Sequence, residues 1–161
     1  MIRPFNTYGP RQSYRAVIPT VISQIAAGFR ELKLGATFPT RDFNYVQDTV
    51  RGFICALKAD TAAGKVVNIG SGFEISIADT VKTIARLMGS EVTILEDAIR
   101  LRPENSEVTR LVADNSMAAE LLAWHPEFAG LEGLERGLHH TINWFLDEKN
   151  RSSKQIGSYT V

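Results

Sequence analysis

The sequence predicts an α/β domain, because segments with the spacing of half-buried helices alternate along it with short β-branched segments. The chain has 161 residues, of which 44% are hydrophobic, so it can bury one core but not two. The predicted strands are short and too few to close a sheet on their own. We therefore expect one structural unit over residues 1–148 and a flexible polar tail over 149–161.

The strands are predicted from β-branched or alternating residues between turn signals. The chain opens with an apolar extended stub that we expect to break at Asn6 into a loop, since Gly9-Pro10 is a strong turn signal. The strand ending at Ile69 reads as buried and is followed by the turn Gly70-Ser71-Gly72. The remaining strands are expected over residues 32–34, 42–46, 91–95 and 111–113.

Helices are predicted where apolar residues recur three and four positions apart. A first helix over 17–25 ends near Gly28, and a second runs from about Gln47 to Asp60. Ser76 and Asp79 resemble a capping box in front of an apolar stripe that stops at Gly89. Two more helices are expected, one capped by Asp114 or Asn115 and one with an apolar face from Leu131 to Phe145.

Composition excludes several functions. Basic and acidic residues both number 18, so no global positive field favours nucleic acid. No run of about 18 apolar residues predicts a membrane span, and the N-terminus lacks the pattern of a secretory signal, so we expect a cytoplasmic protein. Cys55 is the only cysteine and is interpreted as a packed core thiol.

Arginine-bearing loops are the candidate ligand contacts, because a guanidinium offers paired donors that match phosphate oxygens. Arg11 and Arg15 lie in the first loop and could bind a phosphate; the alternative is that this segment is an ordinary polar loop. Arg41 either reaches a ligand phosphate or forms a structural ion pair with Asp42 or Asp48. The loop over 100–107 follows a predicted strand and is either a ligand loop or a solvated one.

Other constellations predict no chemistry. The three histidines do not have the spacing of a metal site, so no metal is expected. Gly70-Ser71-Gly72 does not continue as a dinucleotide-binding loop and is interpreted as a turn. No nucleophile elbow occurs, and no tyrosine is followed four residues later by lysine, so no catalytic residue is predicted.

Three ordered motifs nevertheless resemble one family. They are Arg3-Pro4-Phe5-Asn6-Thr7-Tyr8-Gly9-Pro10-Arg11, Arg41-Asp42-Phe43-Asn44-Tyr45-Val46-Gln47-Asp48 and Asn68-Ile69-Gly70-Ser71-Gly72. Together they resemble the C-terminal substrate-binding part of the extended short-chain dehydrogenase/reductases, the NAD-dependent nucleotide-sugar epimerases and dehydratases. Segments 102–108 and 124–127 look most like the 4,6-dehydratases that act on UDP-N-acetylglucosamine or related sugars.

The resemblance implies the following site. Asn6 would contact the sugar diphosphate, Arg41 and Arg102 would clamp ribose and phosphates, and Asn68 would line the same pocket. Thr20 and Leu34 match segments that wrap the nucleotide base, and Pro4 would lie near the nicotinamide. The ligand would be a UDP- or GDP-linked sugar.

The family's glycine-rich cofactor loop and its Tyr-x-x-x-Lys pair have no counterpart in this sequence, which resembles a fold without most of the Rossmann cofactor domain. The resemblance therefore implies that the intact family enzyme uses NAD, whereas this chain alone binds no cofactor and is catalytically incomplete. Exposed apolar surface where that domain would pack predicts a homo-oligomer. The alternatives are a stand-alone, non-catalytic nucleotide-sugar binding or regulatory module, and a degenerate gene product that folds poorly.

Overall fold

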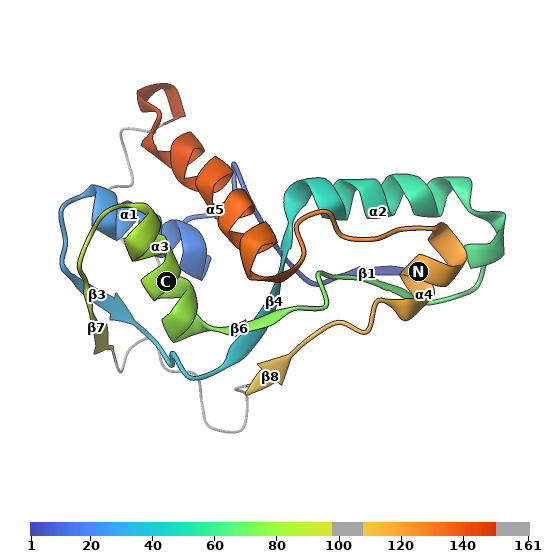
Figure 1. Cartoon of the computed structure of the whole chain (residues 1–161), viewed down its shortest axis with the longest axis horizontal. Helices are drawn as coiled ribbons and strands as arrows, with labels where there is room; N and C mark the ends of the chain where they lie inside the picture. Colours follow the sequence, from blue (N-terminus) through green and yellow to red (C-terminus); the bar gives the residue numbers. More distant parts are fainter. Residues whose placement is uncertain (98–107, 151–161) are drawn as a thin grey trace.

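The computed structural model describes residues 1–97 and 108–150, and it has the predicted α/β architecture (Figure 1). The described strands are β1 (Ile2–Pro4), β2 (Asn6–Tyr8), β3 (Glu31–Leu34), β4 (Thr40–Tyr45), β5 (Val67–Ile69), β6 (Glu74–Ser76), β7 (Thr93–Glu96) and β8 (Arg110–Leu111). The described helices are α1 (Val17–Ala26), α2 (Val46–Lys58), α3 (Ile77–Leu87), α4 (Ser116–Leu122) and α5 (Gly130–Leu146), with short 3-10 turns at Asp60–Ala62 and Glu148–Asn150.

The first eight residues form one extended run that changes partner in its middle. β1 pairs in parallel with β5, and β2 pairs in parallel with β4, with Tyr8 opposite Tyr45. The joint is Phe5, whose backbone N–H donates to Ile69 O at 2.9 Å. The expected break at Asn6 is therefore wrong, because pairing with β4 gives these residues backbone partners and keeps them extended as far as Tyr8.

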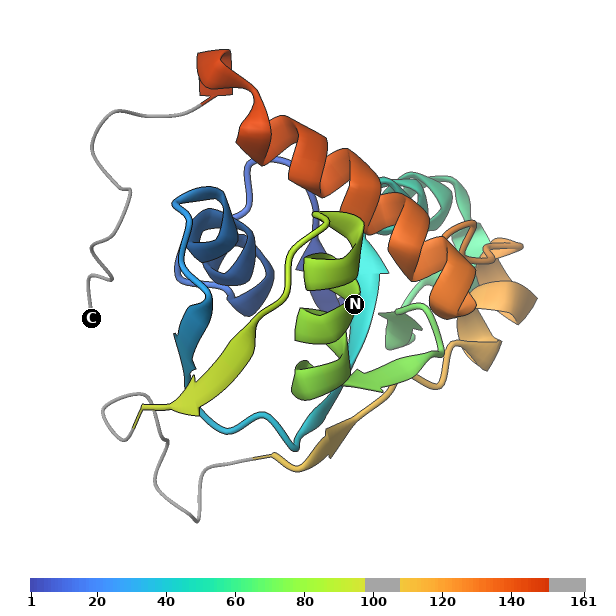
Figure 2. The same cartoon turned by 60° about the vertical axis from the view of Figure 1, so that its left-hand side comes forward.

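The described strands form three small sheets, and helices cover them. β4 is central, with β2 and β8 parallel to it and β6 antiparallel, while β3 and β7 make a separate parallel pair. Helices α1, α3 and α5 contact one another, and Figure 2 shows α5 crossing over the other two. The main core lies between these helices and the sheets and contains Ile18, Ile22, Leu32, Val81 and Leu138.

A second apolar cluster holds the other end of the molecule together. Val67 and Ile69 of β5 pack there with Trp124 and with residues of α4. Gly52 of α2 permits the close approach, because a Cβ at this position would lie 2.7 Å from Ile69 Cγ2. Cys55 is half-buried against this cluster.

Local rules predicted α3 correctly. Ser76 Oγ accepts a hydrogen bond from Asp79 N at 2.9 Å and donates one to Asp79 Oδ2 at 2.7 Å, which confirms the expected cap. For α4, Asp114 Oδ1 accepts from Ser116 N at 3.0 Å, whereas the Asn115 side chain donates to Gly70 O at 2.9 Å. Strand β6 was not predicted, because its sequence Glu74-Ile75-Ser76 contains a single apolar residue and so shows no repeat of apolar positions.

Within residues 1–97 and 108–150, none of the helices combines the length and the apolar character that crossing a membrane requires.

Candidate ligand site

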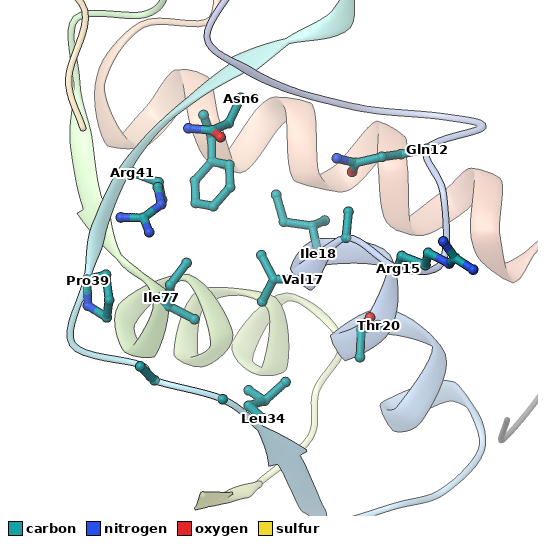
Figure 3. A pocket seen from close by; sticks show the side chains of 14 residues that line it. Asn6, Gln12, Arg15, Val17, Ile18, Thr20, Leu34, Pro39, Arg41 and Ile77 are labelled. Carbon is teal, nitrogen blue, oxygen red and sulfur yellow. The ribbon is translucent and has the colours of Figure 1, made fainter. Parts of the chain in front are cut away.

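A cavity of about 300 Å³ lies between α1, the start of α3 and strands β2, β3 and β4 (Figure 3). Asn6 and Gln12 lie on one side of it, Leu34 lies across from them, and Arg41 and Arg15 lie toward opposite ends. Its polar side chains thus surround an apolar floor. The described lining residues are Asn6, Gln12, Arg15, Ala16, Val17, Ile18, Thr20, Leu34, Gly35, Ala36, Pro39, Arg41, Phe43 and Ile77.

Four of the residues predicted from sequence meet in this cavity. They come from four separate elements and are Asn6, Thr20, Leu34 and Arg41. Asn68 lies outside the cavity lining, in β5, where its Nδ2 donates to Asp114 O at 3.0 Å. Pro4 is exposed in β1 and also lies outside the lining, and Arg102 falls outside the described residues.

Arg41 is held at the cavity wall by backbone carbonyls. Its Nη1 donates to Thr40 O at 2.8 Å and to Val108 O at 2.7 Å. These bonds fix the plane of the guanidinium before any ligand arrives, which reduces the entropy cost of binding an anion. Arg15, by contrast, is exposed at the rim of the cavity, and its guanidinium points outward in Figure 3.

The amide and hydroxyl side chains of the cavity are also tied to the backbone. Asn6 Nδ2 donates to Asp42 O at 3.3 Å, and Thr20 Oγ1 donates to Tyr14 O at 2.8 Å. Gln12 Nε2 donates to Thr7 O at 3.0 Å. Gln12 was missed from sequence, although its place beside Arg11 in a loop after Gly9-Pro10 was a usable signal.

The apolar floor was missed for a different reason. Val17, Ile18 and Ile77 stand at the first turns of α1 and α3, and periodicity assigned such residues to the core. Ile18 is indeed fully buried, yet it also lines the cavity. A pattern of apolar residues cannot distinguish a core side chain from one that faces a ligand across the same layer.

Asp42 lies beside Arg41 in sequence, but its carboxylate is bound by a backbone nest. Oδ1 accepts from Ser71 N at 2.9 Å and from Ser71 Oγ at 2.6 Å, and Oδ2 accepts from Gly72 N at 2.9 Å and Ala113 N at 3.0 Å. The proposed structural partner of Arg41 is thus occupied by the turn. Gly70 is required there because a Cβ would lie 2.5 Å from Ala113 Cβ.

Asp48, the other proposed partner of Arg41, fastens the segment before α5. Its Oδ1 accepts from Glu127 N at 3.0 Å and its Oδ2 from Phe128 N at 2.8 Å, while its carbonyl accepts from Trp124 Nε1 at 3.1 Å. Burial raises the pKa of Asp48, and the Phe128 N–H and the Arg51 guanidinium oppose that rise. Its role is structural.

Tyr8 cannot serve as a proton donor to a ligand. Its hydroxyl donates to Leu134 O at 3.1 Å, and the side chain is 1% exposed. Burial also raises its pKa far above the usual range for tyrosine. This tyrosine therefore stabilises the packing of α5 on β2.

The turn Gly70-Ser71-Gly72 is not a cradle for a dinucleotide. In this turn the Ser71 and Gly72 N–H groups donate to the Asp42 carboxylate, so they cannot hold a pyrophosphate. In the part of the chain that the structure describes, no three metal-ligating side chains gather where they could hold an ion.

Comparison with known proteins identifies the family. The family model of GDP-mannose 4,6 dehydratase matches residues 1–136. This chain belongs to that family. The prediction from the three motifs, an extended short-chain dehydrogenase/reductase of the epimerase and dehydratase type, is confirmed.

Similarity to individual proteins supports the same family. The chain is 32% identical to a UDP-N-acetyl-alpha-D-glucosaminuronate decarboxylase of Bacillus cytotoxicus, over 93% of this chain and 47% of the relative. It superimposes with a TM-score of 0.77 and 30% identity on a UDP-glucuronic acid 4-epimerase of Bacillus cereus in complex with UDP-glucuronic acid and NAD, covering 89% of this chain and 43% of that one. RMD of Pseudomonas aeruginosa complexed with NADPH gives a TM-score of 0.78 at 26% identity, covering 90% and 47%.

The chain thus spans about half the length of the relatives it matches. The relatives include lyases and isomerases of nucleotide sugars, and related structures contain NAD or NADPH.

Proposed function

We propose that this chain is the nucleotide-sugar binding part of an NAD-dependent 4,6-dehydratase or epimerase. One observation carries the proposal: four residues implied by the family motifs, from four different elements, line a single cavity. Its volume of about 300 Å³ lies at the lower end for ligand sites, which suits a pocket that encloses part of a nucleotide sugar.

The chemistry of the lining supports an anion with an apolar neighbour. Arg41 offers donors to a diphosphate at one end of the cavity, and Arg15 adds positive charge at the rim of the other end. Leu34, with the lining residues Gly35 and Ala36 next to it in the chain, offers apolar surface and backbone groups to a nucleobase. In the intact family enzyme, the residues of this cavity would hold the nucleotide sugar, and a separately bound NAD would supply the redox chemistry.

We further propose that the sequence given does not carry out this reaction by itself, since it has no Tyr-x-x-x-Lys pair. The alternative, a stand-alone binding module, is favoured by one fact: the described lining comes from residues 6–77 and needs no second chain.

The direct test of binding is isothermal titration of the chain with UDP- and GDP-linked sugars. Binding with Kd in the micromolar to millimolar range supports the proposal, and Arg41→Ala should weaken it by roughly tenfold. No heat with any nucleotide sugar at millimolar concentration contradicts it. Adding NAD to the binding-competent chain then tests the proposal that the chain is catalytically incomplete, because formation of a 4-keto sugar would contradict it.

We also propose that the chain self-associates. Four large apolar side chains at helical spacing on α2 are exposed, with Leu57 at 87%. The others are Val50, Phe53 and Ile54. Because this stripe is continuous along one helix face, a second copy laid antiparallel would bury it. Sedimentation velocity should show a dimer that Leu57→Glu converts to a monomer; a concentration-independent monomer would contradict the proposal.

A further inference from the structure

The amide of Gln12 has a defined orientation. Its Nε2 lies 3.0 Å from Thr7 O, and a carbonyl oxygen only accepts, so the NH₂ group must face Thr7. The carbonyl oxygen Oε1 must therefore face away from Thr7. In Figure 3 the amide points into the cavity above Ile18, on the same side as Asn6.

Gln12 Oε1 is a buried acceptor without a partner among the described residues. A buried acceptor left unpaired destabilises a protein by much more than an exposed one, so such an atom inside a ligand cavity gains from a donor that arrives with the ligand. Gln24 provides an internal comparison. Its Oε1 accepts from Lys33 N at 3.2 Å, its Nε2 is buried without a partner, and it lies outside the cavity lining.

The nature of the missing donor follows from the surroundings. A carbonyl oxygen repels the oxygens of a diphosphate, which belong near Arg15 and Arg41. The apolar side at Leu34, suited to a nucleobase, lies across the cavity from Gln12. The ribose carries the nucleobase directly, so its hydroxyl groups lie on that side as well. The donors that remain are the hydroxyl groups of the glycosyl unit.

Resting on the proposed function, we propose that Gln12 Oε1 accepts a hydrogen bond from a glycosyl hydroxyl of the bound nucleotide sugar and so discriminates among sugars. The Thr7 carbonyl holds the amide in place, which makes the acceptor position rigid. A sugar that lacks this hydroxyl leaves the acceptor unpaired, so it binds more weakly.

The test is a set of titrations with UDP, UDP-glucose and the four UDP-monodeoxyglucoses lacking the hydroxyl at C2, C3, C4 or C6. Wild type should bind one deoxy sugar about tenfold more weakly than UDP-glucose. Gln12→Met, which has similar length and no polar atom, should lose about the same factor with UDP-glucose, show no further loss with that deoxy sugar, and keep its affinity for UDP. Gln24→Met is the matched control and should bind all ligands as wild type does.

Several outcomes would overturn the inference. Equal wild-type affinity for all the deoxy sugars would do so without any variant, so a poorly folded Gln12→Met would not leave the question open. An equal loss with UDP and UDP-glucose in Gln12→Met would place the contact on the nucleotide instead. If the wild-type chain binds neither UDP nor UDP-glucose, the proposed function itself fails, and this inference fails with it.

Discussion

The hydroxyl of Tyr8 fills the space that a side chain at Gly137 would need. A Cβ built on Gly137 would lie 2.1 Å from Tyr8 Oη and 2.9 Å from its Cζ. The same hydroxyl donates to Leu134 O one turn earlier on α5. The contact joins residues near the two ends of the chain, and it sets how closely α5 packs on β2 and β4.

Gly137→Ala should therefore destabilise the protein even though alanine is the better helix former. We expect a net loss of about 2 kcal/mol, because the overlap with Tyr8 outweighs a propensity gain of about 1 kcal/mol. Tyr8→Phe should cost about 1 kcal/mol through its lost hydrogen bond. Chemical denaturation of both single variants and the double variant checks this, and the double should lose less than the sum.

His139→Ala is the control for this cycle, because its side chain is exposed on the same helix and should change stability by less than about 0.5 kcal/mol. Strict additivity of Tyr8→Phe and Gly137→Ala would show that the two positions do not compete for space.

Asp42→Ala should be among the most destabilising substitutions in the chain. It would leave the Ser71, Gly72 and Ala113 amides without their acceptor, and the Ser71 hydroxyl with only the Phe73 carbonyl at 3.3 Å. We expect a loss of roughly 3–5 kcal/mol in the free energy of unfolding. Hydrogen exchange at the Ser71 and Gly72 amides should accelerate as well.

Asp42→Asn should fall between wild type and Asp42→Ala, because it keeps one acceptor oxygen but turns an NH₂ group toward two donors. Asp60→Ala is an exposed aspartate control and should be nearly neutral. If Asp42→Ala proves as mild as that control, the nest contributes little to stability.

Glu74 should make stability depend on pH in the acid range. The hydrogen bond from Arg110, and then that from Thr40, lower the pKa of Glu74 below its ordinary 4.5. The unfolded chain then binds the proton more readily, so the stabilisation is fully present above that ordinary value and is lost as pH falls through the lowered one. Glu74→Gln should flatten this part of the profile of unfolding free energy against pH.

Arg110→Ala should flatten the profile in the same way, because Arg110 supplies the largest cause of the shift. Urea unfolding between about pH 3 and pH 6 measures this. A wild-type slope retained in both variants would show that other carboxylates produce it.

The two arginines of the first loop should differ in ligand affinity. Arg15 lies at the rim of the cavity, whereas Arg11 is exposed and outside the lining. Arg15→Ala should weaken UDP-glucose binding by roughly fivefold through the lost interaction with the diphosphate, and Arg11→Ala should stay within about twofold. Raising the salt concentration should reduce the difference in UDP-glucose affinity between wild type and Arg15→Ala. Equal effects of the two variants would show a general charge effect rather than a contact.

Sequence reasoning worked where structure is set by neighbours in the chain. The cap of α3 at Ser76 and the stripe of α1 depend on residues within a turn or two, and both are as predicted. It failed at Asn6, where a local turn signal was outweighed by pairing with β4, far away in sequence. It also missed the nest around Asp42, because only the folded chain brings Ser71 and Ala113 to one carboxylate.

The residues of the candidate site also fall into two groups, those predicted from sequence and those found only in the structure. The family resemblance gave four of the lining residues: Asn6 and Arg41 lie within its motifs, and Thr20 and Leu34 lie in the segments between them. Gln12 and the apolar floor around Ile18 became visible only once α1, β2 and β4 were placed against one another.

The described lining of the cavity comes from one uninterrupted stretch between Asn6 and Ile77, although α5 and α4 buttress the fold from elsewhere. A recombination event with breakpoints outside that stretch would move the whole set of lining residues into another member of the family at once. Ligand preference in this part of the chain can therefore be inherited largely as a block, although Val108, whose carbonyl holds Arg41, lies outside the stretch.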